Sequence, residues 1–126
     1  MNKQEKLQKL LSQLHFIIVR VTQDLEIPSS EQGKVVRKKM AVFTYGVADA
    51  LANLEMVDSK ELYFQYLQNN GLSNHQAHVM VERTCFLHLK KDFGQPCMRA
   101  GKEAVKEFVT KSDQYSFNIR ELLFNS

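Results

Sequence analysis

One face of the first 25 residues repeats with a regularity that only a helix uses. Apolar side chains recur in alternating steps of four and three residues, at Leu7, Leu11, Leu14, Ile18, Val21 and Leu25. This is the a/d spacing of a heptad, which places all of them along one side of an α-helix. Leu10 and Ile17 widen the stripe to the breadth typical of a helix packed in a bundle. The pattern predicts a long amphipathic N-terminal helix.

Helix breakers and capping residues divide the rest of the chain. Pro28 is expected to stop the first helix, because the residue before a proline disfavours the α conformation. Serine and aspartate accept hydrogen bonds from the free N–H groups of a first turn, and glycine suits the left-handed position after a helix. These signals predict further helices over residues 31–57, 60–69, 73–93 and between the breaks at 94–96 and 112–113, with a short apolar tail helix at 117–124.

Two of these helices have distinctive compositions. The second carries small residues at helical spacing, which let a neighbouring helix approach closely: Ala41, Gly46, Ala48, Ala50 and Ala52. The fourth is apolar nearly all the way round, which is typical of a helix at the centre of a bundle: Val79, Met80, Val81, Phe86, Leu87, Leu89 and Phe93. We expect an all-α, single-domain bundle of five or six helices over residues 1–126, with the fourth helix buried.

Composition excludes other classes. Five glycines and two prolines in 126 residues are too few for a turn-rich all-β domain. No apolar run reaches the roughly 18 residues of a membrane span, so no membrane partner is expected. Two cysteines, Cys85 and Cys97, do not make a disulfide framework, and the N-terminus lacks the pattern of a signal peptide. We expect a cytoplasmic protein with reduced thiols.

Two features favour a protein that works through protein–protein contacts. The heptad stripe extends over nearly three heptads, which makes Leu7, Leu11, Leu14, Ile18 and Val21 candidates for an interface. Tyr63, Phe64 and Tyr66 crowd into a ten-residue helix that cannot bury all of them on one narrow face. The first hypothesis is a small non-enzymatic adaptor or regulator that binds a protein partner or a second copy of itself.

The turn between the third and fourth helices supports an alternative. Gly71, Leu72 and Ser73 are followed by an inward small residue, Ala77, which is the local pattern of many helix-turn-helix units. Residues 61–81 are therefore a candidate DNA-binding unit, since Asn and Gln pair with adenine and basic side chains contact phosphate. The nucleic-acid candidates are Asn74, His75, Gln76, His78, Arg83, Lys34, Arg37, Lys38 and Lys39.

Other features count against DNA binding. Leu67 is bulky where the motif has a small residue, and residues 49–61 hold four acidic side chains against one lysine. Acidic charge beside a DNA-binding face is repelled by phosphate. An exposed turn beside the Lys34–Lys39 cluster favours DNA, whereas a covered turn favours the adaptor. That cluster and a second basic stretch at 90–106 also suit an acidic protein surface.

A metal- or thiol-dependent enzyme is the remaining alternative. His75, His78 and Glu82 step by three and four residues along one side of the fourth helix, and Cys85 continues the row. Such spacings can chelate a transition metal, but the usual bundle site takes ligands from two helices, and no second helix offers a matching row. We therefore expect no metal site, no catalytic residues and no cofactor.

Overall fold

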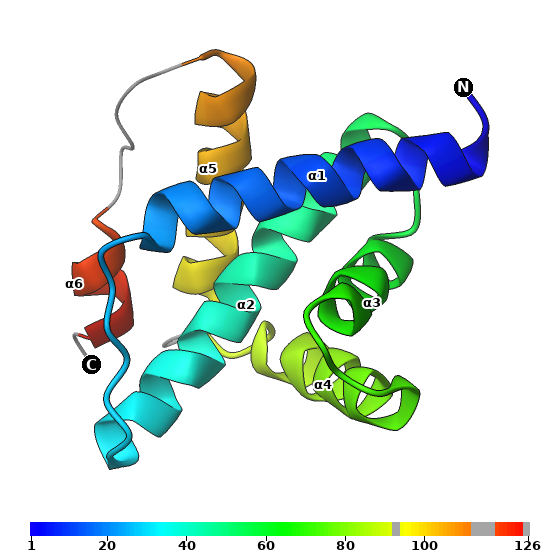
Figure 1. Cartoon of the computed structure of the whole chain (residues 1–126). Helices are drawn as coiled ribbons and strands as arrows, with labels where there is room; N and C mark the ends of the chain where they lie inside the picture. Colours follow the sequence, from blue (N-terminus) through cyan, green and yellow to red (C-terminus); the bar gives the residue numbers. More distant parts are fainter. Residues whose placement is uncertain (92–93, 112–117, 125–126) are drawn as a thin grey trace.

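A computed structural model describes residues 1–91, 94–111 and 118–124. These residues form six helices and no strand, which confirms the prediction of an all-α bundle (Figure 1). The helices are α1 (Lys3–Thr22), α2 (Glu31–Leu54), α3 (Ser59–Asn69), α4 (Asn74–Leu87), α5 (Gly94–Val109) and α6 (Ile119–Phe124). The expected break at 112–113 and the first residues of the expected tail helix lie outside the described residues.

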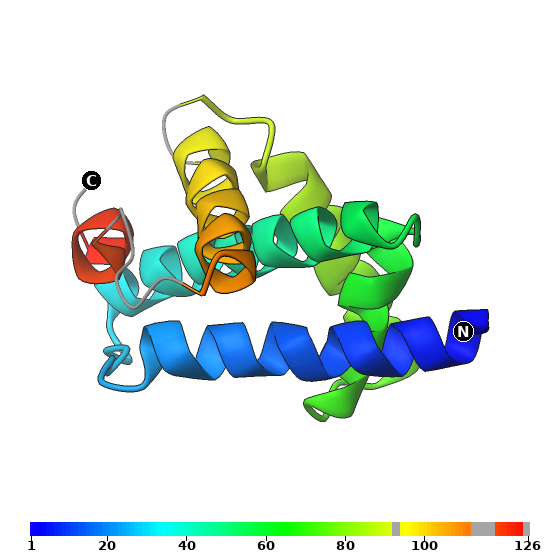
Figure 2. The ribbon, with the colours of Figure 1, turned by 90° about the horizontal axis from the view of Figure 1, so that it is seen from above.

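The central helix is α2. It runs between α1 on one side and α5 on the other, as the view from above shows (Figure 2). Every residue from Val42 to Ala48 is buried, so the middle of this helix is covered on all sides. The helices α3, α4 and α6 also contact α2, which makes it the element that holds the molecule together.

Small residues bring α2 and α5 into backbone contact, as the composition of the second helix predicts. A Cβ atom built on Gly46 would lie 2.6 Å from the carbonyl oxygen of Met98. A Cβ on Gly101 would lie 2.5 Å from the carbonyl oxygen of Phe43. Only hydrogen fits at these two positions, so the two helices cross at the closest distance that their backbones allow.

The first helix buries one broad face and ends earlier than expected. Its buried residues are Leu7, Leu10, Leu11, Leu14 and Ile17. This face is wider than a single heptad row, because it includes Leu10 and Ile17. Two members of the row, Ile18 and Val21, are only half-buried. The prediction that Pro28 stops the helix is wrong, since α1 ends at Thr22, whose hydroxyl donates to the Ile18 carbonyl oxygen (2.6 Å). A proline disfavours the helical conformation of the residue before it, but it does not determine how far upstream the helix has already ended.

The fourth helix is shorter and more exposed than predicted. It ends at Leu87, six residues before the expected end, and α5 begins at Gly94, where a break was expected. Only Ala77, Val81 and Thr84 of α4 are buried, while 67% of Phe86 is exposed. The prediction of a buried fourth helix is therefore wrong. Its apolar residues differ in burial: Val81 is buried, Met80 and Leu87 are half-buried against the core, and Phe86 faces solvent.

Candidate functional site

The heptad residues proposed as an interface lie in the core of their own chain. Leu7, Leu11 and Leu14 are buried, and all three belong to the main hydrophobic cluster. Ile18 and Val21 are half-buried and pack against the same cluster. Leu7, Leu11 and Leu14 would have to leave this core before a second copy of the chain could contact them.

The aromatic residues of α3 join helices rather than face outward. The Tyr63 hydroxyl lies 3.1 Å from the Thr84 hydroxyl of α4, and its ring lies 5.4 Å from the Tyr45 ring of α2. Burial raises the pKa of Tyr63 to about 12. Phe64 and Tyr66 are half-buried and pack against the core. These contacts explain the aromatic cluster as structural support for the α3–α4 pair.

The nucleic-acid candidates on α4 are exposed: Asn74, His75, Gln76 and His78 near its start, and Arg83 in its C-terminal half. Two of them already have structural contacts. The Gln76 side chain accepts from the backbone N–H of Ser73 (2.9 Å), while the Ser73 hydroxyl accepts from the backbone N–H of Gln76 (3.1 Å). The His78 ring lies 4.5 Å from the Phe64 ring of α3. Pairing with adenine needs both the side-chain oxygen and the side-chain nitrogen of Gln76, and the hydrogen bond from Ser73 already occupies the oxygen.

The basic cluster of α2 is not a continuous charged surface. Only 5% of Lys39 is exposed, so its inclusion among surface residues is wrong. Lys34 pairs with Glu31 at 3.0 Å, and Arg37 donates to the carbonyl oxygen of Pro28 (3.2 Å). Lys38 alone lines a groove with α4, where its neighbours are in the C-terminal half of that helix. The cluster thus meets α4 away from the exposed first turn.

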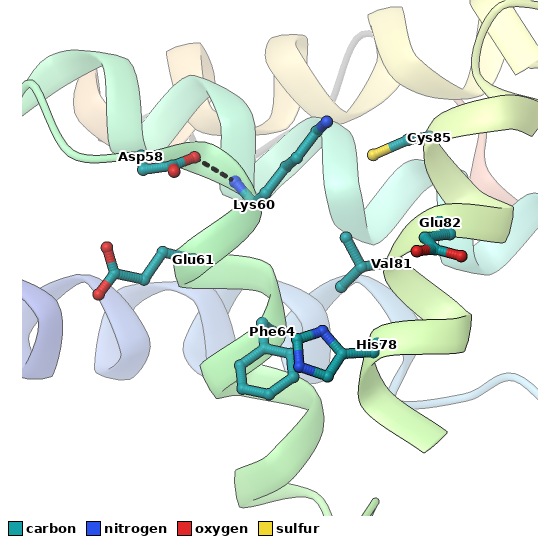
Figure 3. A pocket seen from close by; sticks show the side chains of 8 residues that line it. All are labelled: Asp58, Lys60, Glu61, Phe64, His78, Val81, Glu82 and Cys85. Carbon is teal, nitrogen blue, oxygen red and sulfur yellow. Dashed lines mark hydrogen bonds between the residues drawn. The ribbon is translucent and has the colours of Figure 1, made fainter. Parts of the chain in front are cut away.

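Three of the thiol and metal candidates, His78, Glu82 and Cys85, line a cavity of about 510 Å³ between α3 and α4. Figure 3 shows the side chains of Lys60 and Cys85 pointing toward each other across it, with His78 against the Phe64 ring on one wall. The cavity is also lined by Asp58, Glu61, Val81 and Glu82. His75 is absent from this lining and lines a different groove. Within the described ranges, no group of three or more His, Cys, Asp or Glu side chains is placed to hold a metal ion.

Sequence reasoning missed the outer face of α4. This surface consists of two grooves, of about 480 and 450 Å³, which meet at Arg83. The first is lined by Leu72, His75, Gln76, Val79, Met80 and Arg83, and the second by Lys38, Glu82, Arg83, Phe86 and Leu87. Spacings of three and four residues from Gln76 to Leu87 mark one side of a helix, and Ala77, Val81 and Thr84 mark the other. Treating these two rows of α4 separately in the sequence would have identified the row that lines the grooves.

Ion pairs neutralise the acidic segment that seemed to oppose DNA binding. Glu55 pairs with Lys9 at 2.6 Å, Glu61 with Lys3 at 3.2 Å and Asp49 with Lys102 at 3.7 Å. The hydrogen bond from Lys9 lowers the pKa of Glu55. The remaining acid, Asp58, accepts from the backbone N–H of Lys60 and caps α3.

Basic charge is left on the outer face of α4. Within the part of the chain that the structure describes, neither Lys38 nor Arg83 forms an ion pair. The ammonium group of Lys90 lies 5.6 Å from the centre of the Phe86 ring. Of the lining residues that the structure describes in the two grooves, one is acidic, Glu82. The face is therefore apolar with a basic rim.

Comparisons with known proteins place no relative beside this chain: no family model, no curated protein and no solved structure matches it. Among the described helices, none has both the length and the apolar character needed to cross a membrane.

Proposed function

We propose that this protein is a small non-enzymatic adaptor or regulator that binds another polypeptide through the outer face of α4. The exposure of Phe86 carries the proposal, because 67% of this large apolar side chain faces solvent beside the apolar grooves. Leu89, two residues after the end of α4, is another exposed apolar side chain, with 65% of its surface facing solvent. Aromatic residues beside apolar grooves are typical anchors of protein interfaces.

The two faces of α4 explain why such exposure is retained. Ala77, Val81 and Thr84 are buried on the inner face, and the partly buried Met80 and Leu87 also pack against the core, whereas Phe86 does not belong to the core cluster. Burying a side chain such as Phe86 is worth about 1.5–3 kcal/mol, so an exposed one is a source of binding free energy. Contiguous exposed apolar surface on a small protein commonly marks a contact site. The proposal replaces the heptad row of α1 with this face as the contact surface.

Selection from a displayed library of random 16-residue peptides tests the proposal. We expect peptides to be enriched on the wild-type protein and to lose about tenfold or more in affinity on Phe86→Ser, as for an interface anchor. Leu54→Ser is the matched control, because 62% of Leu54 is exposed at the far end of α2. Circular dichroism and urea unfolding check that both variants are folded. If no enriched peptide distinguishes Phe86→Ser from Leu54→Ser, the proposal is rejected.

A nucleic-acid function keeps one supporting observation, which is the exposure of Asn74 and His75 in the first turn of α4 and of Arg83 in its C-terminal half. Phosphate contacts to Arg83 would give binding that weakens steeply with salt. Retention on a 20-base-pair duplex at low salt, compared between the wild type and Arg83→Ala, tests this alternative. Equal retention of the two proteins would remove it.

A further inference from the structure

We infer that the segment bound by the outer face of α4 is an acidic amphipathic helix from a different protein. The inference rests on the proposed function and specifies its partner. Three observations carry it: the charge of the rim, the internal pairing of this chain's most acidic segment, and the spacing of the two grooves along one helix.

The rim of the face is basic. Arg83 lies where the two grooves meet, and Lys38 approaches the second groove from α2. Lys90 lies over Phe86 at the far end. Among the described residues that line the grooves, only Glu82 opposes these three cations. Complementary charge at an interface speeds association and rejects wrong partners, so carboxylates are the side chains that this rim selects.

A second copy of the chain does not supply that complement. Two outer faces placed together would bring the excess basic charge of one rim, from Lys38, Arg83 and Lys90, close to that of the other, and like charges across an interface oppose binding. Residues 49–61, the most acidic segment, have three carboxylates paired with Lys3, Lys9 and Lys102. Freeing them would break contacts that join α1 and α5 to the rest of the bundle. A different chain is therefore the occupant.

The grooves suit a helix. The residues that line them on α4 run from His75 to Leu87, which at 1.5 Å per residue is a length of about 18 Å. Equivalent positions in the two grooves, such as Val79 and Phe86, are two turns apart on α4. An amphipathic helix offers anchors at the same spacing, i and i+7, with an acidic residue between them opposite Arg83. Its interface needs about three to four turns.

A displayed library of 16-residue helices tests this chemistry. Apolar residues are fixed at positions i and i+7, and the flanking positions are randomised among Glu, Gln and Lys. On the wild-type protein we expect Glu to be enriched at the flanking positions, and affinity to fall about tenfold between low and high salt. On Arg83→Glu and Lys38→Glu we expect the preference to reverse to Lys. Lys106→Glu, at an exposed position on α5, is the matched control and should keep the preference for Glu.

The outcomes separate this inference from the proposed function. If the selected peptides depend on Phe86 but show no preference for Glu, or keep it on Arg83→Glu, the acidic helix is rejected and a polypeptide-binding face remains. If no peptide depends on Phe86, both are rejected. Arg83-dependent retention of duplex DNA without peptide binding identifies the rim as a phosphate site. Concentration-dependent sedimentation of the wild type that Phe86→Ser abolishes identifies a second copy as the occupant. Either result overturns the inference.

Discussion

At the scale of single residues, the interior of this bundle keeps several polar groups neutral. Burial raises the pKa values of Tyr45, Tyr63 and Tyr66, with Tyr63 reaching about 12. Burial likewise raises the pKa of the Cys97 thiol to about 11, although nearby Lys39 opposes the shift. The hydroxyl of Tyr63 lies within hydrogen-bond distance of the Thr84 hydroxyl, at 3.1 Å. These groups make the folded state sensitive to alkaline pH.

Alkaline pH should therefore destabilise the protein. Unfolded chains release these protons first, near pH 9 for the thiol and pH 10 for the phenols, while the folded state holds them to higher pH. Stability is complete below pH 9 and falls as the pH rises through 10 to 12, by about 1.4 kcal/mol per pH unit for each group. Urea unfolding midpoints from pH 7 to 11 measure the fall. A midpoint that stays constant to pH 11 would contradict this, and Tyr63→Phe should reduce the slope.

At the scale of helices, the sequence predicts starts better than ends. The caps at Asp58 and Ser73 were readable, because a short polar side chain that accepts from the first turn is a local device. The ends at Thr22 and Leu87 depend on contacts between distant segments. Gly94, for example, lies so close to Leu87 that a Cβ atom would be 1.9 Å from the Leu87 carbonyl oxygen. Such packing between elements leaves no local pattern.

The face that each helix buries was also only partly predictable. The spacing of leucines in α1 identified its inner side, since Leu7, Leu11 and Leu14 are all buried. It could not show whether that side met the chain's own core or a partner. In α4 the apolar pattern was read as one feature, although Val81 lies on the inner face and Phe86 on the outer one. Apolar periodicity reports where contacts are favourable, not which molecule makes them.

The crossing of α2 and α5 gives a prediction at this scale. In Gly101→Ala the new methyl group would lie 2.5 Å from the Phe43 carbonyl oxygen and 2.7 Å from the Val47 backbone nitrogen. Alanine favours a helix by about 1 kcal/mol over glycine, but forcing two backbones apart costs about 1–3 kcal/mol or more. We expect a net loss of about 1–2 kcal/mol in the free energy of unfolding, measured in urea. Arg99→Ala, exposed on the same helix, should change it by less than about 0.5 kcal/mol.

At the scale of the whole molecule, five helices contact α2, and the lysines of α1 and α5 balance the acidic segment at 49–61. Each of these surface ion pairs contributes about 0–1 kcal/mol, so apolar packing around α2 dominates stability. The pairing also redistributes charge. The acidic segment is neutralised, and part of the basic excess remains beside α4. The order of charges along the chain predicts separate acidic and basic segments. Only the fold shows which of these charges form ion pairs with each other.

The inward position of the α1 leucines predicts how the whole molecule responds to their loss. Leu14 is fully buried, so Leu14→Ala should lower the free energy of unfolding by about 2–5 kcal/mol. The sedimentation coefficient of the folded protein should stay that of the wild type, because this leucine contacts its own core. Val19→Ala, at an exposed position on the same helix, is the control and should cost less than about 1 kcal/mol. If the wild type sediments as a dimer and Leu14→Ala as a folded monomer, the prediction is wrong and self-association through α1 is supported.

The division of α4 into two faces has a consequence for how this protein evolves. Selection for folding acts on Ala77, Val81 and Thr84, while Val79, Arg83 and Phe86 on the other side contribute little to the core. Substitutions on the outer side can therefore accumulate without the stability loss that usually limits adaptation. A duplicated copy of this chain could acquire a new partner by changing a few positions of one helix, while the inherited bundle stays intact.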